Sequence, residues 1–275
     1  MIQDIYPHVL HNHFDPSKRP SSQSIVLSFK ENDLLINGGT LPRMADFRDA
    51  QEHDMVYLFT VDDDKDFYLY RKEPAPENIP VGYEYINVRT LRGSGAVAGY
   101  MAFAIYTGLH LSHWYSNNRY CGKCGSLTRP DGNERALRCD CGNIIYPRIS
   151  PAVIVGVTNG DRLLVTKYRT GFAHFALVAG FTEIGETLEE TVAREVMEET
   201  GLKVRNIRYY KSQPWGIVDD LLVGFFCDVD GDDTIKMDES ELKIAEWRER
   251  SEIELQPDQF SLTNEMMTVF KKGLL

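Results

Sequence analysis

The chain has 275 residues, of which 43% are hydrophobic and 26% are charged, the composition of an ordinary globular protein. Its formal net charge of −11 at pH 7 argues against nonspecific binding to nucleic acid or an anionic membrane. The negative charge does not exclude a phosphate-bearing substrate, because a bound metal ion can reverse the local charge. With no run of about 18 apolar residues and no signal-peptide pattern, we expect a cytoplasmic protein that does not enter the membrane.

The first third of the chain predicts short strands separated by turns such as Asn37-Gly38-Gly39. The expected strands are 24–29, 55–61, 67–70 and 83–88. Further on the pattern changes, because Met101, Ile105 and Leu109 recur at helical spacing. We therefore expect an amphipathic helix at 95–115.

The second half of the chain mixes strands and helices. β-Branched runs predict strands at 152–157 and 162–166, joined by a hairpin turn at Asn159-Gly160. The other expected elements are an apolar run at 175–179, a helix at 187–200, strands near 204–212 and 221–229, and a helix at 262–271. The predicted elements are strands in the first part of the chain and a mixture of strands and helices in the second. This order predicts an α+β protein with two units flanking a small metal module.

Four of the five cysteines lie close together, as Cys121-x-x-Cys124 and, fourteen residues later, Cys139-x-Cys141. Two close pairs of thiolates suit tetrahedral Zn²⁺, and four of them leave no open position, so the predicted site is structural. The second pair is one residue shorter than the usual C-x2-C. Free structural thiols and a redox pair remain alternatives. Cys227 stands apart in an apolar run and is expected to be a buried strand thiol.

The expected helix at 187–200 carries three carboxylates on one face. Glu195, Glu198 and Glu199 are three and four residues apart, so their side chains crowd together. Like charges at this spacing destabilise the helix, whereas hard cations such as Mg²⁺ seek oxygen ligands and bridge substrate phosphates. Helical spacing alone leaves a solvated surface helix as the alternative.

The residues around this helix fit a longer pattern, G-x5-E-x7-R-E-U-x-E-E-x-G-U, in which U is aliphatic. Every constrained position is met, by Gly180, Glu186, Arg194, Glu195, Val196, Glu198, Glu199, Gly201 and Leu202. The segment therefore resembles the Nudix box, a loop–helix–loop that holds catalytic Mg²⁺ or Mn²⁺. The resemblance implies that Glu195 and Glu199 are the principal ligands, with Glu198 close by, and that Glu186 and Arg194 brace the loop against the helix.

A cysteine ribbon before the box and Ser212-Gln213-Pro214-Trp215 after it resemble the NADH pyrophosphatase subfamily. The resemblance implies a homodimer that splits NAD(H) into NMN(H) and AMP, and some members remove NAD caps from RNA. It also implies three parts: a degenerate Nudix-like α+β domain at 1–115, a zinc ribbon at 116–147, and a catalytic Nudix domain at 148–275 folded as an α/β/α sandwich.

Individual residues carry over from the subfamily. Glu241 is the expected further metal ligand or base, and Ala179 is expected to offer its backbone oxygen to the metal. Glu241 thus joins Glu195, Glu198 and Glu199 as a catalytic residue. The implied substrate contacts are Arg89, Glu134, Tyr146, Phe181, Gln213, Pro214, Trp215, Gly216, Ile217, Val218, Asp219, Asp220 and Thr263.

One segment departs from the subfamily. Its signature continues after the tryptophan as Pro-Phe-Pro-x-Ser, whereas this chain reads Gly216-Ile217-Val218-Asp219-Asp220. The loss of two prolines leaves the loop less fixed in conformation, and two acidic residues near a polyphosphate could repel it or recruit another cation. The choice between NADH and NAD⁺ therefore stays open, and Trp215 could instead be a core aromatic.

Other functions remain as alternatives. The same chemistry could act on ADP-ribose, another dinucleotide or NAD-capped RNA. A nucleotide sensor that binds without cleaving is a different class, but its box would be expected to be eroded, and here every carboxylate is present. An interaction module built on the ribbon is the third alternative. The sequence does not assign the general base.

Overall fold

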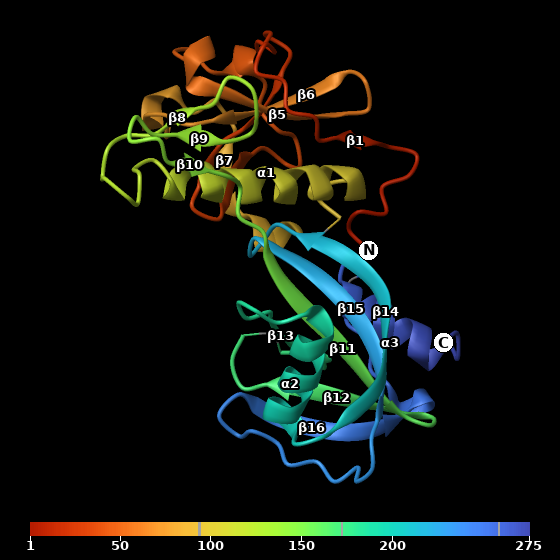
Figure 1. The fold of residues 1–275 in the computed structure, drawn as a ribbon. Coiled ribbons are helices and arrows are strands. Elements are labelled where there is room, and N and C mark those ends of the chain that lie inside the picture. The colour runs from red at the N-terminus through yellow and green to blue at the C-terminus, as the bar shows by residue number, and fades with distance from the viewer. Residues whose placement is uncertain (93–94, 172, 258) are drawn as a thin grey trace. The chain divides into compact units, whose positions relative to one another are not determined.

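The computed structural model describes residues 1–92, 95–171, 173–257 and 259–275 (Figure 1). The chain divides into two compact units. We call the first the C-terminal unit; it holds residues 1–2, 150–214 and 220–275. The second, the N-terminal unit, holds residues 3–149 and 215–219. The short segment after Pro214 therefore groups with a different unit from the strands on either side of it.

Two small sheets form the N-terminal unit. The first has the strand order β1-β5-β6-β2 and consists of β1 Leu10–His11, β2 Ile25–Leu27, β5 Met55–Val61 and β6 Lys65–Tyr70. The second has the order β3-β4-β7 and consists of β3 Phe29–Lys30, β4 Asp33–Ile36 and β7 Glu84–Asn87. These strands confirm the predicted ones, and the predicted strand 24–29 is divided between the two sheets as β2 and β3. The sequence analysis missed β1 and β4.

Helix α1, Gly99–Asn117, is the predicted helix, begun four residues later and extended by two. Its buried side chains include Ile105, Leu109 and Trp114. Short 3-10 helices lie at η1 Met44–Asp46, η2 Glu52–Asp54, η3 Pro76–Asn78, η4 Val88–Leu91 and, in the C-terminal unit, η5 Arg250–Glu252.

The cysteine segment of the N-terminal unit carries a third, very short sheet. Its order is β10-β9-β8, with β8 Arg129–Pro130, β9 Leu137–Arg138 and β10 Ile144–Ile145. Strand β9 leads directly into Cys139, so the backbone hydrogen bonds of the sheet fix the position of the second cysteine pair.

The C-terminal unit is built on a six-stranded sheet with the order β14-β15-β11-β12-β16, in which β13 also pairs with β11. Its strands are β11 Ser150–Asn159, β12 Arg162–Tyr168, β13 Val178–Phe181, β14 Val204–Trp215, β15 Asp220–Val229 and β16 Leu242–Glu249. The predicted hairpin between β11 and β12 is confirmed. Strand β16 was missed; it pairs antiparallel with β12 over most of its length.

Helices α2, Leu188–Thr200, and α3, Leu262–Lys271, cover opposite faces of this sheet (Figure 1). Successive residues of a strand point to opposite faces. Val153 and Val155 of β11 accordingly belong to one core cluster with Val192 of α2, whereas Ile154 belongs to another with Met266 of α3. The chain is thus a mixed α+β protein, and its C-terminal unit is the predicted α/β/α sandwich. Helix α3 has the predicted bounds.

Cys227 lies in β15 with no solvent exposure, which confirms the expected buried strand thiol. Over the described part of the chain, no helix combines the length and the apolar character that a membrane crossing requires.

Candidate active site

Helix α2 begins and ends where its sequence predicts. The Glu190 backbone nitrogen donates to the Thr187 hydroxyl at 3.2 Å, and the Thr187 nitrogen donates to the Glu190 carboxylate at 2.8 Å, which completes a capping box. At the other end Gly201 adopts the left-handed conformation, with φ of 69°, and stops the helix. These caps fix which residues of α2 face the loop before it.

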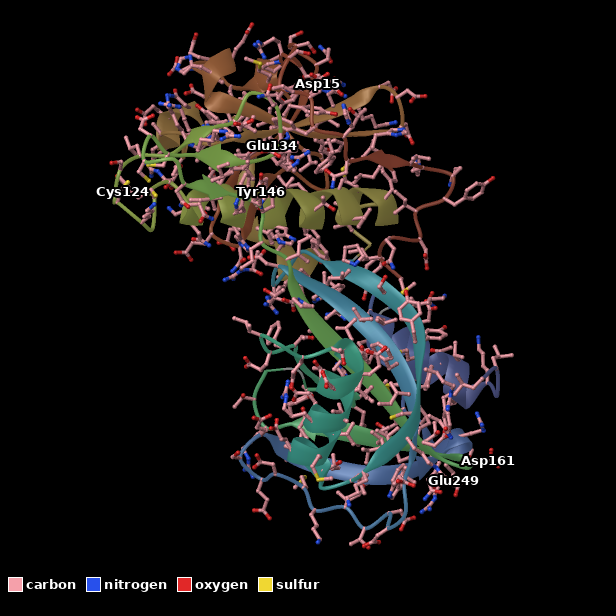
Figure 2. The ribbon with its side chains drawn as sticks, viewed as in Figure 1. Asp15, Cys124, Glu134, Tyr146, Asp161 and Glu249 are labelled. Atoms are coloured by element: carbon pink, nitrogen blue, oxygen red, sulfur yellow. The ribbon has the colours of Figure 1, made fainter. Side chains whose placement is uncertain are left out.

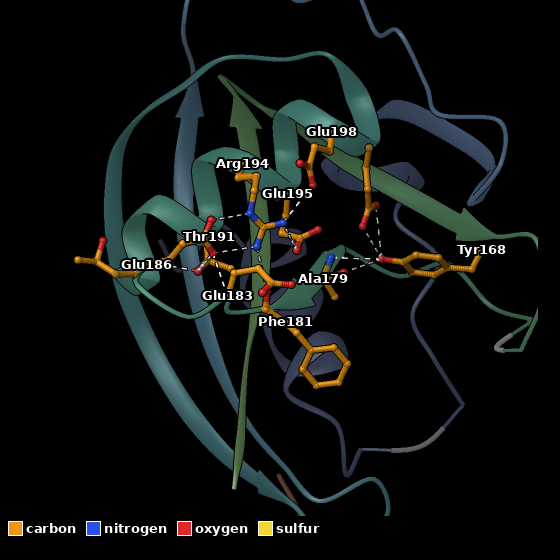
Figure 3. Close-up of polar contacts among 11 residues, drawn as sticks. Tyr168, Ala179, Phe181, Glu183, Glu186, Thr191, Arg194, Glu195 and Glu198 are labelled. Carbon is orange, nitrogen blue, oxygen red and sulfur yellow. Dashed lines mark hydrogen bonds and ion pairs between the residues drawn. The ribbon is translucent and has the colours of Figure 1, made fainter.

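Arg194 braces that loop against the helix (Figure 3). Its Nε and Nη2 atoms donate to the two carboxylate oxygens of Glu186 at 2.6 and 2.9 Å, and Nη2 also donates to the backbone oxygen of Phe181 at 2.9 Å. The guanidinium lowers the pKa of Glu186 to about 2. The brace expected of these two residues is present, and a bidentate charge-assisted pair gives it a defined geometry.

Glu199 is the most buried carboxylate of the box, with 2% of its surface exposed. Burial, followed by the nearby charge of Glu195, raises the pKa of Glu199 to about 8. The hydroxyl of Tyr168 lies 3.3 and 3.4 Å from the two Glu199 oxygens and accepts a hydrogen bond from the Ala179 backbone nitrogen at 3.2 Å (Figure 3). Tyr168 therefore links the buried carboxylate to the backbone next to the box glycine.

Glu195 lies against that glycine. A Cβ atom on residue 180 would overlap the Glu195 carboxylate, so the site needs glycine at this position. The Glu195 side chain is 13% exposed, and burial raises its pKa although Arg194 donates to it at 2.7 Å. Glu198, 59% exposed, receives a second bond from Arg194 at 3.0 Å.

Glu241 lies in the loop just before β16 and is exposed. Its charge is among the causes that raise the pKa of both Glu195 and Glu199. The structure thus brings the three predicted carboxylate ligands into one electrostatic neighbourhood, in which Glu199 lies close to the backbone of Ala179.

This arrangement fits a hard divalent cation. Two carboxylates with raised pKa values repel each other and lack a full complement of positive partners, because Arg194 contacts Glu195 but has no bond to Glu199. Mg²⁺ typically binds through one or two carboxylates and keeps waters or phosphate oxygens for its other positions. An open set of carboxylates beside a backbone oxygen offers such ligands.

The four clustered cysteines offer a different kind of site. Their sulfur atoms all lie within 4.8 Å of one another; Cys121 and Cys141 are 3.8 Å apart, and Cys124 and Cys139 are 3.3 Å apart. A Zn–S bond of 2.3 Å in a tetrahedron requires a sulfur–sulfur distance of about 3.8 Å. In the described part of the chain, this is the one such close group of His, Cys, Asp or Glu ligands. The four thiols fit a closed zinc site, and the short C-x-C pair takes part in it.

Several predicted substrate contacts lie at the surface of their own units. Within the predicted ribbon, the hydroxyl of Tyr146 donates to Glu134 at 2.9 Å (Figure 2). Arg89 is exposed on η4, and Phe181, at the end of β13, is 55% exposed. Thr263 is half-buried in the first turn of α3. Their contact with a substrate stays a prediction.

Gln213 has a clear structural task. It is fully buried, its amide nitrogen donates to the Phe260 backbone oxygen at 2.6 Å, and its amide oxygen accepts from the Leu262 nitrogen at 2.7 Å. It thereby ties β14 to the start of α3. Pro214 beside it is exposed, and Asp220 is buried at the start of β15, opposite Ser150.

The segment that departs from the subfamily packs on α1 within the N-terminal unit. A Cβ atom on residue 216 would overlap the Tyr106 backbone oxygen, so glycine is needed there. The side chain of Ile217 is buried, Val218 is exposed, and Asp219 pairs with His113 at 2.9 Å. Gly216, which stands where the subfamily has its first proline, and Asp219, at the variable position of the signature, thus make specific contacts with α1.

Trp215 lies edge-on to Tyr106, with ring centroids 6.2 Å apart, and Arg92 stacks over its ring at 5.0 Å. This packing fits the alternative of a structural aromatic. A role in substrate binding stays a prediction for this residue and for residues 216–220.

Tyr168 was missed by the sequence analysis. It ends β12 as an ordinary strand residue, and no motif marks it. Only the folded register, which places it opposite Leu242 at the start of β16 and beside Ala179, reveals its contact with Glu199.

Residues 148–267, in the C-terminal part of the chain, match the NUDIX domain family model. Two curated relatives, both named NAD-capped RNA hydrolase NudC, come from Enterobacter sp. (strain 638) and Actinobacillus succinogenes. Each is 41% identical over 154 residues, covering 54% and 53% of this chain respectively. The chain is thus similar to NudC proteins, and the matched region spans 58% of the length of each relative.

A solved structure of a NUDIX hydrolase from Nitrosomonas europaea covers 56% of this chain and 91% of its own, with 21% identity and a TM-score of 0.49.

Proposed function

We propose that this protein is an NAD(H) diphosphatase, which hydrolyses the pyrophosphate of NAD(H) to NMN(H) and AMP. The observation that carries the proposal is the cluster of Glu195, Glu199 and Glu241 beside the backbone of Ala179, in a box that retains every carboxylate. The similarity to relatives named for hydrolysis of NAD-capped RNA supports the NAD-type substrate.

The residues of the site have separate roles, in binding the metal and in positioning its ligands. Glu195, Glu199 and Glu241, with the Ala179 oxygen, would hold Mg²⁺ or Mn²⁺. Such ions, when bound, neutralise a diphosphate and activate water for attack on phosphorus. Arg194 fixes the Glu195 carboxylate, and Tyr168 fixes that of Glu199. These two contacts fix the positions of the carboxylates that would hold the cation. The position of the cation would in turn align the pyrophosphate.

The most exposed carboxylates of the site are better placed than Glu199 to accept a proton from the attacking water. Glu198 and Glu241 are in contact with solvent, whereas Glu199 is almost wholly buried. A group that takes a proton from an attacking water must reach that water, and Glu241 meets this condition beside the two ligand carboxylates. We therefore assign Glu241 as further ligand or base, and Phe181 as the exposed ring that stacks on a base or nicotinamide.

The four cysteines would hold Zn²⁺ in a structural role. Four thiolates fill a tetrahedral ion completely, so no position is left for a substrate. We keep the division into an N-terminal domain at 1–115, a ribbon at 116–147 and a catalytic domain at 148–275 as part of the proposal. A homodimer and a cytoplasmic location also belong to it; the subfamily resemblance supports the first, and a thiol cluster suited to a reducing compartment supports the second.

NAD-capped RNA is the second candidate substrate, because both relatives carry that name. ADP-ribose contains the same pyrophosphate linkage and is therefore tested beside it. Purified protein would be incubated with NADH, ADP-ribose and NAD-capped RNA in the presence of Mg²⁺ or Mn²⁺, and the products would be identified. We expect NMNH and AMP from NADH. NADH turnover at background level, with another substrate cleaved, would overturn the NAD(H) assignment.

A further inference from the structure

The N-terminal unit contains a pocket that no part of the proposed hydrolysis uses. Its volume is about 630 Å³, within the range of small-molecule sites. It lies where β3, the end of β6 and the C-terminal half of α1 meet, and twelve residues from 29 to 119 line it. None of the residues assigned to the metal, to the ribbon or to substrate binding is among them.

Two arginines in this pocket carry uncompensated charge. Arg71 and Arg119 both line it and both are exposed. Within the described part of the chain, neither guanidinium has an ion pair or a hydrogen bond to a carboxylate. The two guanidiniums therefore give the pocket a local positive charge in a chain whose net charge is −11, and this charge is available to an anionic ligand.

The acidic residues of the pocket are already paired. Asp54 forms an ion pair with Lys72, and Glu73 forms one with Lys30 at 2.8 Å. Because these carboxylates are paired with lysines, they do not neutralise the charge of the two arginines. The end of α1 adds about half a negative charge to the region, which is smaller than the two positive charges facing it.

The rest of the lining suits a ligand with a flat or apolar body. Phe29, Tyr70 and Tyr115 contribute aromatic surface, and the Arg71 guanidinium lies 5.7 Å from the centre of the Tyr115 ring. Ser112 and Ser116 add hydroxyl groups on α1. Guanidinium pairs recognise phosphate in a bidentate way, and aromatic surface accepts a base or another ring.

We propose that this pocket binds a phosphate monoester of mononucleotide size, with the phosphate on Arg71 and Arg119 and the body against the aromatic lining. The site is separate in its residues from the Nudix box. It would serve as a binding site for a nucleoside monophosphate and not as a place of hydrolysis.

The test measures binding of AMP, adenosine and inorganic phosphate to the full-length protein by calorimetry, without added divalent cation. The variants are Arg71→Gln/Arg119→Gln and, independently, Ser116→Asp, which places a negative charge in the pocket. Arg205→Gln, at an exposed position of β14, changes the net charge by one unit as Ser116→Asp does and is the matched control for that variant. We expect AMP affinity to fall about tenfold or more in the double variant and in Ser116→Asp, and to stay within about twofold of the parent in the control.

Adenosine and inorganic phosphate should each bind more weakly than AMP, because each lacks one half of the recognised group. An AMP affinity unchanged in both pocket variants would place AMP elsewhere and overturn the proposal. Inorganic phosphate binding as tightly as AMP would refute the mononucleotide assignment, and so would a parent protein that does not bind AMP. NADH turnover is measured in parallel, so that failure of the proposed hydrolysis is distinguished from failure of this site.

Discussion

Two candidate metal sites among the described residues differ in almost every physical respect. The ribbon gathers four thiols within 4.8 Å of one another on short strands and turns. The Nudix box presents carboxylates that range from 2% exposed at Glu199 to 59% exposed at Glu198, on one helix and the loops beside it. The first set can enclose an ion, and the second leaves room around it.

This difference separates structure from chemistry. A closed thiolate site can stabilise a fold but cannot present an ion to a substrate. In the free protein, burial and, after it, the charges of neighbouring carboxylates raise the pKa values of Glu195 and Glu199 in the box. Such a site is unfavourable for stability and favourable for cation binding, so the two sites should respond in opposite ways to the loss of a ligand.

The largest effect is expected from Glu199→Gln. It removes the charge of a buried proposed ligand while keeping its shape, so NADH turnover should fall on the order of 10²–10³ or more. The folded structure and the zinc content should remain. Glu189→Gln, an exposed change on the same helix, is the control and should keep parental activity. Steady-state kinetics would decide, and parental turnover in Glu199→Gln would remove it from the ligand set.

Cys139→Ser should have the reverse signature. Loss of one of four thiolates should abolish stoichiometric zinc, as measured by elemental analysis, and lower the melting temperature by roughly 5 °C or more. Glu199→Gln is the control, because it is expected to keep its zinc. If Cys139→Ser retained both zinc and stability, the ribbon would not be a metal site.

Arg194→Lys tests the brace with a smaller expected effect. The lysine keeps the charge but cannot make the paired bonds to Glu186, measured at 2.6 and 2.9 Å. Turnover should fall about tenfold, with a higher metal concentration needed for half-maximal activity. Arg205→Lys provides the control. Equal kinetics in the two variants would mean that charge alone, and not the fork geometry, supports the loop.

The smallest effect concerns stability and pH. The folded-state pKa of Glu199, about 8, lies above the ordinary glutamate value of 4.5, so its contribution to stability is full at low pH and is lost as pH rises through about 8. Glutamine does not titrate. Without divalent cations, the stability of Glu199→Gln relative to the parent should therefore rise by roughly 1–3 kcal/mol between about pH 5 and pH 8. Urea unfolding measures this difference, and a difference independent of pH would contradict the buried state of Glu199.

Features encoded locally could be predicted from the sequence. The capping residue Thr187 and the terminating Gly201 set the bounds of α2, and the spacing of Glu195 and Glu199 follows from helical geometry. The hairpin between β11 and β12 and the bounds of α3 were equally local. The brace between Glu186 and Arg194 followed from the family resemblance.

Features that depend on distant contacts could not be predicted. Tyr168 reaches Glu199 only because β12 lies beside β13 and β16, and nothing near it in the sequence marks that contact. Gly216 is explained by the backbone of Tyr106, 110 positions earlier in the chain. Gln213 fits a substrate-binding motif in sequence, and in the fold its amide bonds the backbone at Phe260 and Leu262.

The most direct test of the central claim is a titration of Mg²⁺ and of Mn²⁺ during NADH hydrolysis by the parent protein and by Glu199→Gln. The account predicts no hydrolysis without a divalent cation, saturable activation in the parent, and little or none in the variant. Hydrolysis that proceeds at full rate without the cations, or equal activation of both proteins, would contradict it.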